Sequence, residues 1–255
     1  MPPYIIRILD KGKVIELATG NGRDIDVCQY HDTIGEIKKM LRKNNSRNLT
    51  IFSDGKELDD NLVVDSDITL LLVEYECLID KLIYIENILP TSDFNRVKHA
   101  CGLLDSQLKL EKTDRVVRKI ISLPPPGTPG YRNQNNTLYD IFYGNLFLHR
   151  LKKILGFHVS PSNIPIDYRV YEIGGSMEWH RDTIINPISP QIEVVFTLEN
   201  ESDSTTEWLD ESTNEIHAIW TYPNSVVITQ GGGAYHRVLP VKKGTRSIVK
   251  IAYNL

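Results

Sequence analysis

The feature that most restricts the fold is a series of short apolar runs that begins at Tyr168 and continues to the last residues. The runs are rich in β-branched and aromatic residues and are flanked by Gly, Pro, Asn or Asp, a pattern typical of strands separated by turns. Short strands at even spacing favour a two-sheet β-roll or jelly roll, in which functional side chains gather at one open end. The predicted strands are Tyr168–Ile173, Ile192–Leu198, Ile216–Tyr222, Val226–Thr229 and Arg246–Tyr253.

Two histidines and one aspartate in this half of the chain are of the residue types that bind metals. His180 and Asp182 are two positions apart, so in a β-strand their side chains would point to the same face. His236 offers a second imidazole. Two histidines and a carboxylate on one side of a metal form the facial triad of non-haem Fe(II) oxygenases, which leaves coordination positions open for a co-substrate and dioxygen. A His-x-Asp motif alone also occurs by chance in strands.

The sequence around His236 predicts where a co-substrate would bind. The three glycines before it, Gly231–Gly233, indicate a bulge or tight turn that delivers His236. Lys242-Lys243-Gly244 has the composition of a three-residue hairpin loop that ends in a left-handed glycine. That loop would pair Pro240 with Arg246 and place Arg246 on the face of His236, about 13 Å away at about 3.3 Å per residue. The gap suits a short dicarboxylate that reaches the metal with one end and the guanidinium with the other.

The motifs YEIGGSMEWHRD, HRVLPV and KGTR together resemble the 2-oxoglutarate- and Fe(II)-dependent dioxygenases. The resemblance extends from Leu78 to Leu255 and is strongest to the prolyl 4-hydroxylase branch, which has Tyr-Glu-x-Gly shortly before His-x-Asp. It implies catalytic iron ligation by His180, Asp182 and His236. It also implies that Arg246, where the prolyl branch usually has Lys, binds the distal carboxylate of 2-oxoglutarate, and that Tyr171 contacts this co-substrate. The reaction would then require Fe(II), 2-oxoglutarate and dioxygen, with ascorbate as an optional addition.

The implied activity is hydroxylation of a protein side chain, with proline favoured, coupled to decarboxylation of 2-oxoglutarate to succinate. Two alternatives stay open, namely the same chemistry as oxidative demethylation of nucleic acid, and a catalytically silent interaction protein. Residues 77–155 carry twelve basic and seven acidic side chains, a net +5 in a chain of net charge −4, which is compatible with an acidic substrate. No Lys/Arg cluster lies beside the triad motif, and this favours a protein or peptide substrate.

The sequence of residues 1–76 indicates a separate structural unit. The motifs DTIGEIKKML, IFSDGKELDD and ITLLLV resemble ubiquitin-like domains and follow in their order, with a helix predicted to begin at Asp32. Val73 is followed by Glu-Tyr-Glu and not by Gly-Gly, so the unit would be an embedded β-grasp module that binds a protein partner or only supports its neighbour. The predicted fold class is α+β, with a ubiquitin-like domain over residues 1–76. A dioxygenase domain, a double-stranded β-helix (jelly roll) with supporting helices, would cover residues 77–255.

Other features of the sequence predict two helices, one loop and the cellular location of the protein. A helix is predicted to open at Thr91 and to bury Val97 and Cys101, and another to run from Thr137 to Leu155 and stop at Gly156. The segment SLPPPGTPG at residues 122–130 is predicted to be a loop. Three cysteines without a CxxC motif, no signal-peptide pattern and no apolar run of membrane-spanning length indicate an intracellular protein, cytoplasmic or nuclear.

Overall fold

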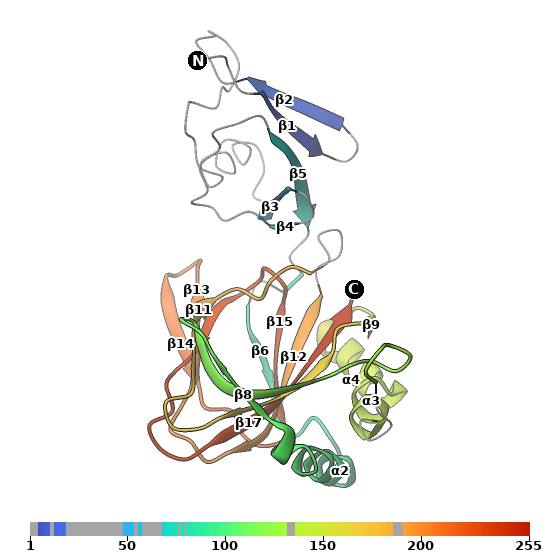
Figure 1. The fold of residues 1–255 in the computed structure, drawn as a ribbon, viewed down its shortest axis with the longest axis vertical. Helices are drawn as coiled ribbons and strands as arrows, with labels where there is room; N and C mark the ends of the chain where they lie inside the picture. Colours follow the sequence, from blue (N-terminus) through green and yellow to red (C-terminus); the bar gives the residue numbers. More distant parts are fainter. Residues whose placement is uncertain are drawn as a thin grey trace. The chain divides into compact units, whose positions relative to one another are not determined.

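In this computed structural model the described residues are strand segments between 5 and 75, and residues 78–79, 81–131, 136–185 and 191–255. The chain divides into two compact units, Met1–Cys77 with Pro187–Ser189 and Leu78–Asn186 with Pro190–Leu255. Figure 1 shows the strands and helices of each unit, coloured along the sequence. In the described part of the chain, no helix is long and apolar enough to cross a membrane.

The first unit contains a five-stranded sheet with the order β2-β1-β5-β3-β4. The central strands β1 and β5 are parallel, whereas β1–β2, β3–β5 and β3–β4 are antiparallel. The helix predicted from Asp32 lies outside the described residues. The strand bounds are β1 Ile5–Asp10, β2 Lys13–Ala18, β3 Asn48–Ser53, β4 Lys56–Glu57 and β5 Ile68–Tyr75.

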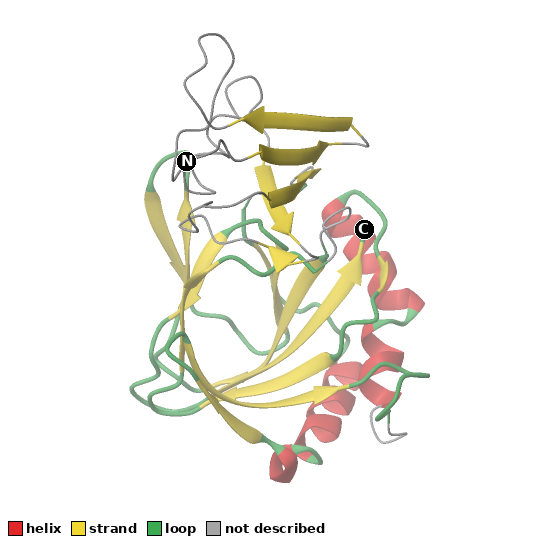
Figure 2. Cartoon of the chain, turned by 45° about the horizontal axis from the view of Figure 1, so that its top comes forward, coloured by secondary structure: helices red, strands yellow, loops and turns green. Residues whose placement is uncertain are grey.

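The second unit is built on a twelve-stranded, antiparallel sheet that curls into a jelly-roll-like half-barrel (Figures 1 and 2). Its order is β14-β13-β16-β11-β8-β10-β17-β12-β15-β6, with β7 paired to β8 and β9 to β17. All five strands predicted from Tyr168 onward are present with shifted ends, whereas β7, β8, β9 and β13 are not predicted. The bounds are β6 Ile83–Ile85, β7 Lys109–Lys112, β8 Val116–Leu123, β9 Ser160–Pro161, β10 Ile166–Tyr171, β11 Ser176–His180, β12 Ile192–Asn200, β13 Thr206–Asp210, β14 Glu215–Ile219, β15 Ser225–Gln230, β16 Tyr235–Val238 and β17 Arg246–Asn254.

Three α-helices, α2 (Thr91–Gly102), α3 (Asn136–Phe142) and α4 (Asn145–Leu155), cover the convex face of the curled sheet (Figure 2). The core lies between them and the sheet, where Val249, Ile251 and Tyr253 of β17 are fully buried together with helix residues. Because successive strand residues alternate between faces, Arg246 and Lys250 of the same strand point to the concave side. The concave side is therefore lined by charged and polar groups, and the convex side by apolar ones.

The predicted helix from Thr137 to Leu155 is wrong in one respect, because the structure divides it into α3 and α4. Gly144 between them has an extended conformation, with φ −70° and ψ 151°. A Cβ at Gly144 would lie 2.3 Å from the carbonyl oxygen of Asp140, so the chain turns at the one residue that permits this approach. The predicted stop is confirmed, since Gly156 ends α4 with φ +81°.

The predicted hairpin after His236 is also wrong. Strand β16 pairs with β11 and β13, whereas β17 pairs with β10, β12 and β9, so Pro240 and Arg246 are not partners. The segment between β16 and β17 forms no hairpin, and its backbone bonds to the turn between β10 and β11 instead. The carbonyl oxygen of Val241 accepts from the N–H of Gly174, and the N–H of Val241 donates to the carbonyl oxygen of Gly175. The N–H groups of Lys242 and Lys243 donate to Asp203 Oδ1. Gly244 does adopt the predicted left-handed conformation, with φ +72°.

Candidate metal centre and co-substrate pocket

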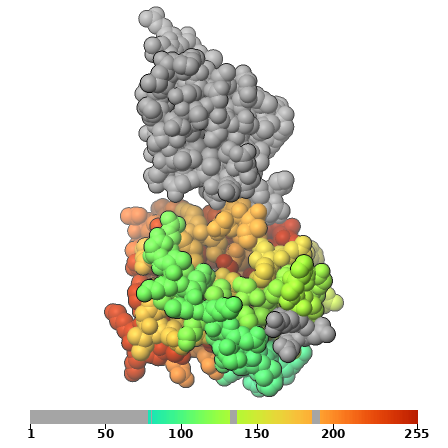
Figure 3. Space-filling view, in the orientation of Figure 1, coloured from blue at the N-terminus to red at the C-terminus, as the bar shows by residue number. Residues whose placement is uncertain are grey.

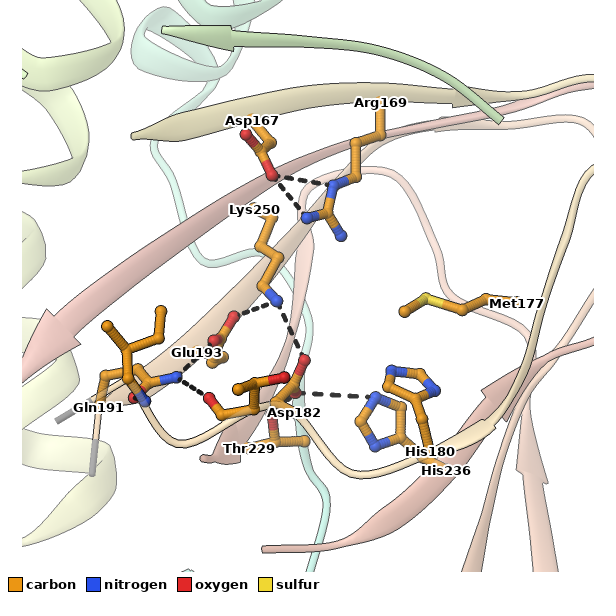
Figure 4. Close-up of polar contacts among 12 residues, drawn as sticks. Asp167, Arg169, Met177, His180, Asp182, Gln191, Glu193, Thr229, His236 and Lys250 are labelled. Carbon is orange, nitrogen blue, oxygen red and sulfur yellow. Dashed lines mark hydrogen bonds and ion pairs between the residues drawn. The ribbon is translucent and has the colours of Figure 1, made fainter. Parts of the chain in front are cut away.

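The two histidines of the candidate centre lie opposite each other on neighbouring strands. His180 ends β11, and its cross-strand partner on β16 is His236. Their ring centroids are 4.3 Å apart. Between Met177 and His180 the register shifts by one residue, which is a β-bulge. Met177 therefore joins His180 and His236 on one side of the sheet, as Figure 4 shows.

Asp182 follows the end of β11 and is buried, with 9% of its surface exposed. The turn at Gly232 (φ +71°) confirms the predicted tight turn before His236, and its N–H donates to the carbonyl oxygen of Asp182 at 2.8 Å. The Asp182 carboxylate oxygen Oδ2 then lies 3.8 Å from His236 Nε2. One ligand atom each from His180, Asp182 and His236 lie within 4.8 Å of one another. The predicted convergence is present, although Asp182 reaches the site from beyond the strand end.

Both imidazole rings are oriented by backbone carbonyls. The Nδ1 of His180 lies 2.8 Å from the carbonyl oxygen of Glu178, and the Nδ1 of His236 lies 2.9 Å from that of Ala234. A carbonyl oxygen only accepts, so each Nδ1 carries the proton and each Nε2 presents its lone pair. Backbone-oriented histidines of this kind are typical of metal ligands.

The charges at the centre match the requirements of a divalent cation. Burial, followed by the neighbouring His236, lowers the pKa of His180 to about 4, so this ring is neutral at pH 7. Burial opposes the charge of Asp182, but Lys250 and the two histidines outweigh it and hold the pKa of this carboxyl below its ordinary value. Two imidazole nitrogens and one carboxylate fit Fe(II) as donors, since they form the facial set that this metal binds.

A network of buried polar side chains surrounds the Asp182 carboxylate (Figure 4). Lys250 Nζ donates to Asp182 Oδ1 and Thr229 Oγ1 donates to Oδ2, both at 3.0 Å. Lys250 also forms an ion pair with Glu193, whose other carboxylate oxygen accepts from Gln191 Nε2 at 2.9 Å. Lys250 and Glu193 are not among the predicted site residues. In the sequence, Lys250 is marked only by its position four residues after Arg246, and Glu193 only as an acid inside an apolar run.

Arg246 lies on the concave face and is 2% exposed. Nη1 donates to Thr206 Oγ1 at 3.0 Å, whereas Nε has no hydrogen-bond partner. Among the described residues, no carboxylate lies within ion-pair distance of Arg246. Burial lowers its pKa, so the folded protein holds this charge at a cost. Thr206, which accepts this hydrogen bond, is the cross-strand partner of Val238. Val238 is two residues from His236, which corresponds to about 7 Å along β16. The Arg246 guanidinium is therefore anchored at a point about 7 Å along the strand from His236.

Tyr171 lies between two buried arginines. It is the cross-strand partner of Arg246 and is 1% exposed. From the other side, Arg118 Nη1 donates to the Tyr171 hydroxyl at 3.4 Å. Arg118 is not among the predicted site residues, and it differs from Arg246 in having an acidic partner, Glu111 Oε2 at 2.6 Å. Arg246 and Tyr171 thus lie side by side on neighbouring strands.

Neither a protein-family profile nor a curated protein matches the sequence. Solved structures do match. A Burkholderia pseudomallei oxidoreductase of the 2OG-Fe(II) oxygenase family aligns over 68% of this chain and 84% of its own, with 13% identity and a TM-score of 0.54. The shared fold is that of the 2OG-Fe(II) oxygenases. A Pseudomonas putida prolyl-4-hydroxylase aligns over 68% and 91%, with 13% identity and a TM-score of 0.52. A Trichoplax adhaerens prolyl hydroxylase, solved with a hypoxia inducible factor peptide fragment, aligns over 69% and 84%, with 16% identity and a TM-score of 0.52.

Proposed function

We infer that this protein is an Fe(II)- and 2-oxoglutarate-dependent dioxygenase. His180 Nε2, His236 Nε2 and Asp182 Oδ2 would hold the iron, and Arg246 and Tyr171 would hold 2-oxoglutarate. When bound, the metal and the co-substrate would supply oxidative hydroxylation, with succinate and carbon dioxide as the other products. The backbone carbonyls fix the two rings, while Thr229 and Lys250 fix the carboxylate, so the chain supplies a rigid and half-open set of donors.

The observation that carries the proposal is the uncompensated charge of Arg246. A buried cation without an anionic partner costs free energy, and such a side chain is usually retained only where a ligand completes it. A guanidinium binds a carboxylate through two parallel hydrogen bonds. The distal carboxylate of 2-oxoglutarate supplies this partner, while the keto-acid end reaches the His-Asp-His group.

For the substrate we favour a protein segment, with proline as the leading target residue. Two of the structurally similar proteins are prolyl hydroxylases, one of them with a bound peptide fragment. A groove of about 750 Å³ lies beside β8, between Ser106–Lys109 and Ile120–Pro124. Figure 3 shows the face on which residues of this segment, in green, form much of the surface. Ser122 in the groove donates to Asp167, which pairs with Arg169 on the concave face. A proline-rich chain would enter it with little backbone entropy to lose.

Succinate formation tests the activity and the substrate together. The protein with Fe(II), 2-oxoglutarate and oxygen is given proline-rich peptides or methylated single-stranded oligonucleotides, and product masses are measured. Stimulated succinate and a gain of one oxygen on a peptide proline would support the proposal. Demethylation of the oligonucleotide without a peptide product would show that the substrate is a nucleic acid, and the proposed dioxygenase chemistry would stand. If no succinate forms with any substrate, and none forms in the absence of substrate, the protein is a catalytically silent interaction protein.

For the first unit we propose the ubiquitin-like domain over residues 1–76, with the dioxygenase domain over 77–255 and an intracellular location for the whole. The sheet order β2-β1-β5-β3-β4 with a parallel central pair supports a β-grasp arrangement. A domain of this kind would bind a protein partner and bring the substrate to the second unit.

A further inference from the structure

Both carboxylate oxygens of Asp182 are occupied by donors, and the two donors differ in kind. The Thr229 hydroxyl donates to Oδ2, and the Lys250 ammonium donates to Oδ1, each at 3.0 Å. Oδ2 is also the oxygen that faces His236 Nε2 at 3.8 Å. One oxygen therefore faces the other candidate ligands, and the second faces a cation.

Lys250 is held in place from its other side by a second buried carboxylate. The side chains of Lys250 and Glu193, which form an ion pair, are 18% and 4% exposed. Gln191 Nε2 fixes Glu193 and donates as well to the carbonyl oxygen of Thr183 at 2.7 Å. The strand register supports this position, because Lys250 is opposite Val195, two residues from Glu193. Figure 4 shows the ammonium group between Glu193 and Asp182.

We propose that Lys250 is a positioning residue that makes Asp182 a one-oxygen ligand by reserving Oδ1. An ammonium group and a divalent cation repel each other, so a metal at Oδ2 does not also engage Oδ1 while Lys250 occupies it. A triad of three donor atoms leaves three coordination positions. A chelating keto acid takes two, and an Asp182 bound through both oxygens would close the third. The inference rests on the proposed metal centre.

The test counts the atoms that Asp182 gives to a metal, without turnover. Co(II) alone is added to the full chain, and X-ray absorption at the cobalt edge detects the short metal–carbon distance of a carboxylate bound through both oxygens. Wild type should lack this distance and Lys250→Met should show it. Because Lys250→Met removes a cation beside the metal, its Kd for Co(II) should fall about tenfold. Lys250→Arg, which keeps a charged donor, should restore the wild-type spectrum.

Lys119→Met is the matched control, because Lys119 forms an ion pair with Glu172 at the surface, where the two side chains are 40% and 51% exposed. Its spectrum and Kd should equal those of wild type. Wild-type protein in which Asp182 binds Co(II) through both oxygens would overturn the proposal, whether or not any variant folds. A Lys250→Met variant that binds Co(II) with the wild-type spectrum would do the same. Wild type that binds no Co(II) would overturn the metal centre itself, which separates the two failures.

Discussion

Replacing Arg246 by Met should abolish tight 2-oxoglutarate binding without harming the fold. The side chain is 2% exposed, and among the described residues its hydrogen-bond partner is Thr206 and not an acid. A bidentate carboxylate contact comprises two charge-assisted hydrogen bonds, together worth about 3–5 kcal/mol. Their loss raises the Kd for 2-oxoglutarate by about two to four powers of ten. Arg246→Lys keeps the charge but retains only one of the two hydrogen bonds to the carboxylate. The Kd of this variant for 2-oxoglutarate should therefore rise about ten- to a hundredfold.

The stability of the ligand-free protein should respond in the opposite direction. Replacing a buried charge by an apolar side chain of similar size often raises the free energy of unfolding, by about 1–4 kcal/mol. The lost hydrogen bond to Thr206 offsets about 1 kcal/mol of this. The ligand-free Arg246→Met variant should therefore be as stable as wild type, or more stable by up to about 3 kcal/mol.

Calorimetric titration with 2-oxoglutarate in the presence of Mn(II), and denaturant unfolding without ligands, measure the two effects. Arg96→Met is the control, since Arg96 pairs with Asp93 at the surface of α2 with 55% of its side chain exposed. A Kd within about twofold of wild type, far below the loss expected for one charge-assisted bond, would refute the role of Arg246. A large loss of stability would show instead that Arg246 serves the fold.

Three further predictions concern the centre, its pH dependence and the first unit. Asp182→Asn should weaken Mn(II) binding at least about tenfold, as seen by titration, since a neutral amide replaces the anionic donor. Because the folded pKa of His180 is about 4 and the unfolded value about 6.5, the metal-free protein should lose up to about 3 kcal/mol as pH falls from 6.5 to 4. His180→Asn should remove this part of the pH dependence of unfolding. Deleting residues 1–76 should spare uncoupled succinate formation but weaken turnover of a full-length protein target; an insoluble fragment would indicate a supporting role for the first unit.

The sequence predicts those parts of the site that depend on residue type and spacing. The strands after Tyr168 and the turn before His236 follow from local composition, because β-branched runs and glycines act on their own backbone. The bulge between Met177 and His180 could not be predicted, since it exists only in the register between β11 and β16. A local pattern does not reveal which distant strand it pairs with.

Arg246 illustrates this limit most clearly. The hairpin that was expected to place it does not form, yet its side chain is buried beside Tyr171, because β17 runs between β10 and β12. Strand β8 escaped prediction for a related reason. Its buried Arg118 interrupts an apolar run, and the partner that offsets the burial of this charge, Glu111, lies on a different strand, β7.

The concave face carries two unbalanced charges of opposite sign. At one position Asp182 and Glu193 both pair with Lys250, and among the described residues no other lysine or arginine pairs with either, which leaves an excess negative charge. At another, Arg246 has no acidic partner in the described part of the chain, which leaves an excess positive charge. A single bound cation or a single bound anion would neutralise the excess charge at only one of these positions. A divalent metal together with a dicarboxylate would satisfy both, the metal at Asp182 and the distal carboxylate at Arg246. We therefore expect the two to bind cooperatively, and Mn(II) should tighten 2-oxoglutarate binding to the same degree as 2-oxoglutarate tightens Mn(II) binding.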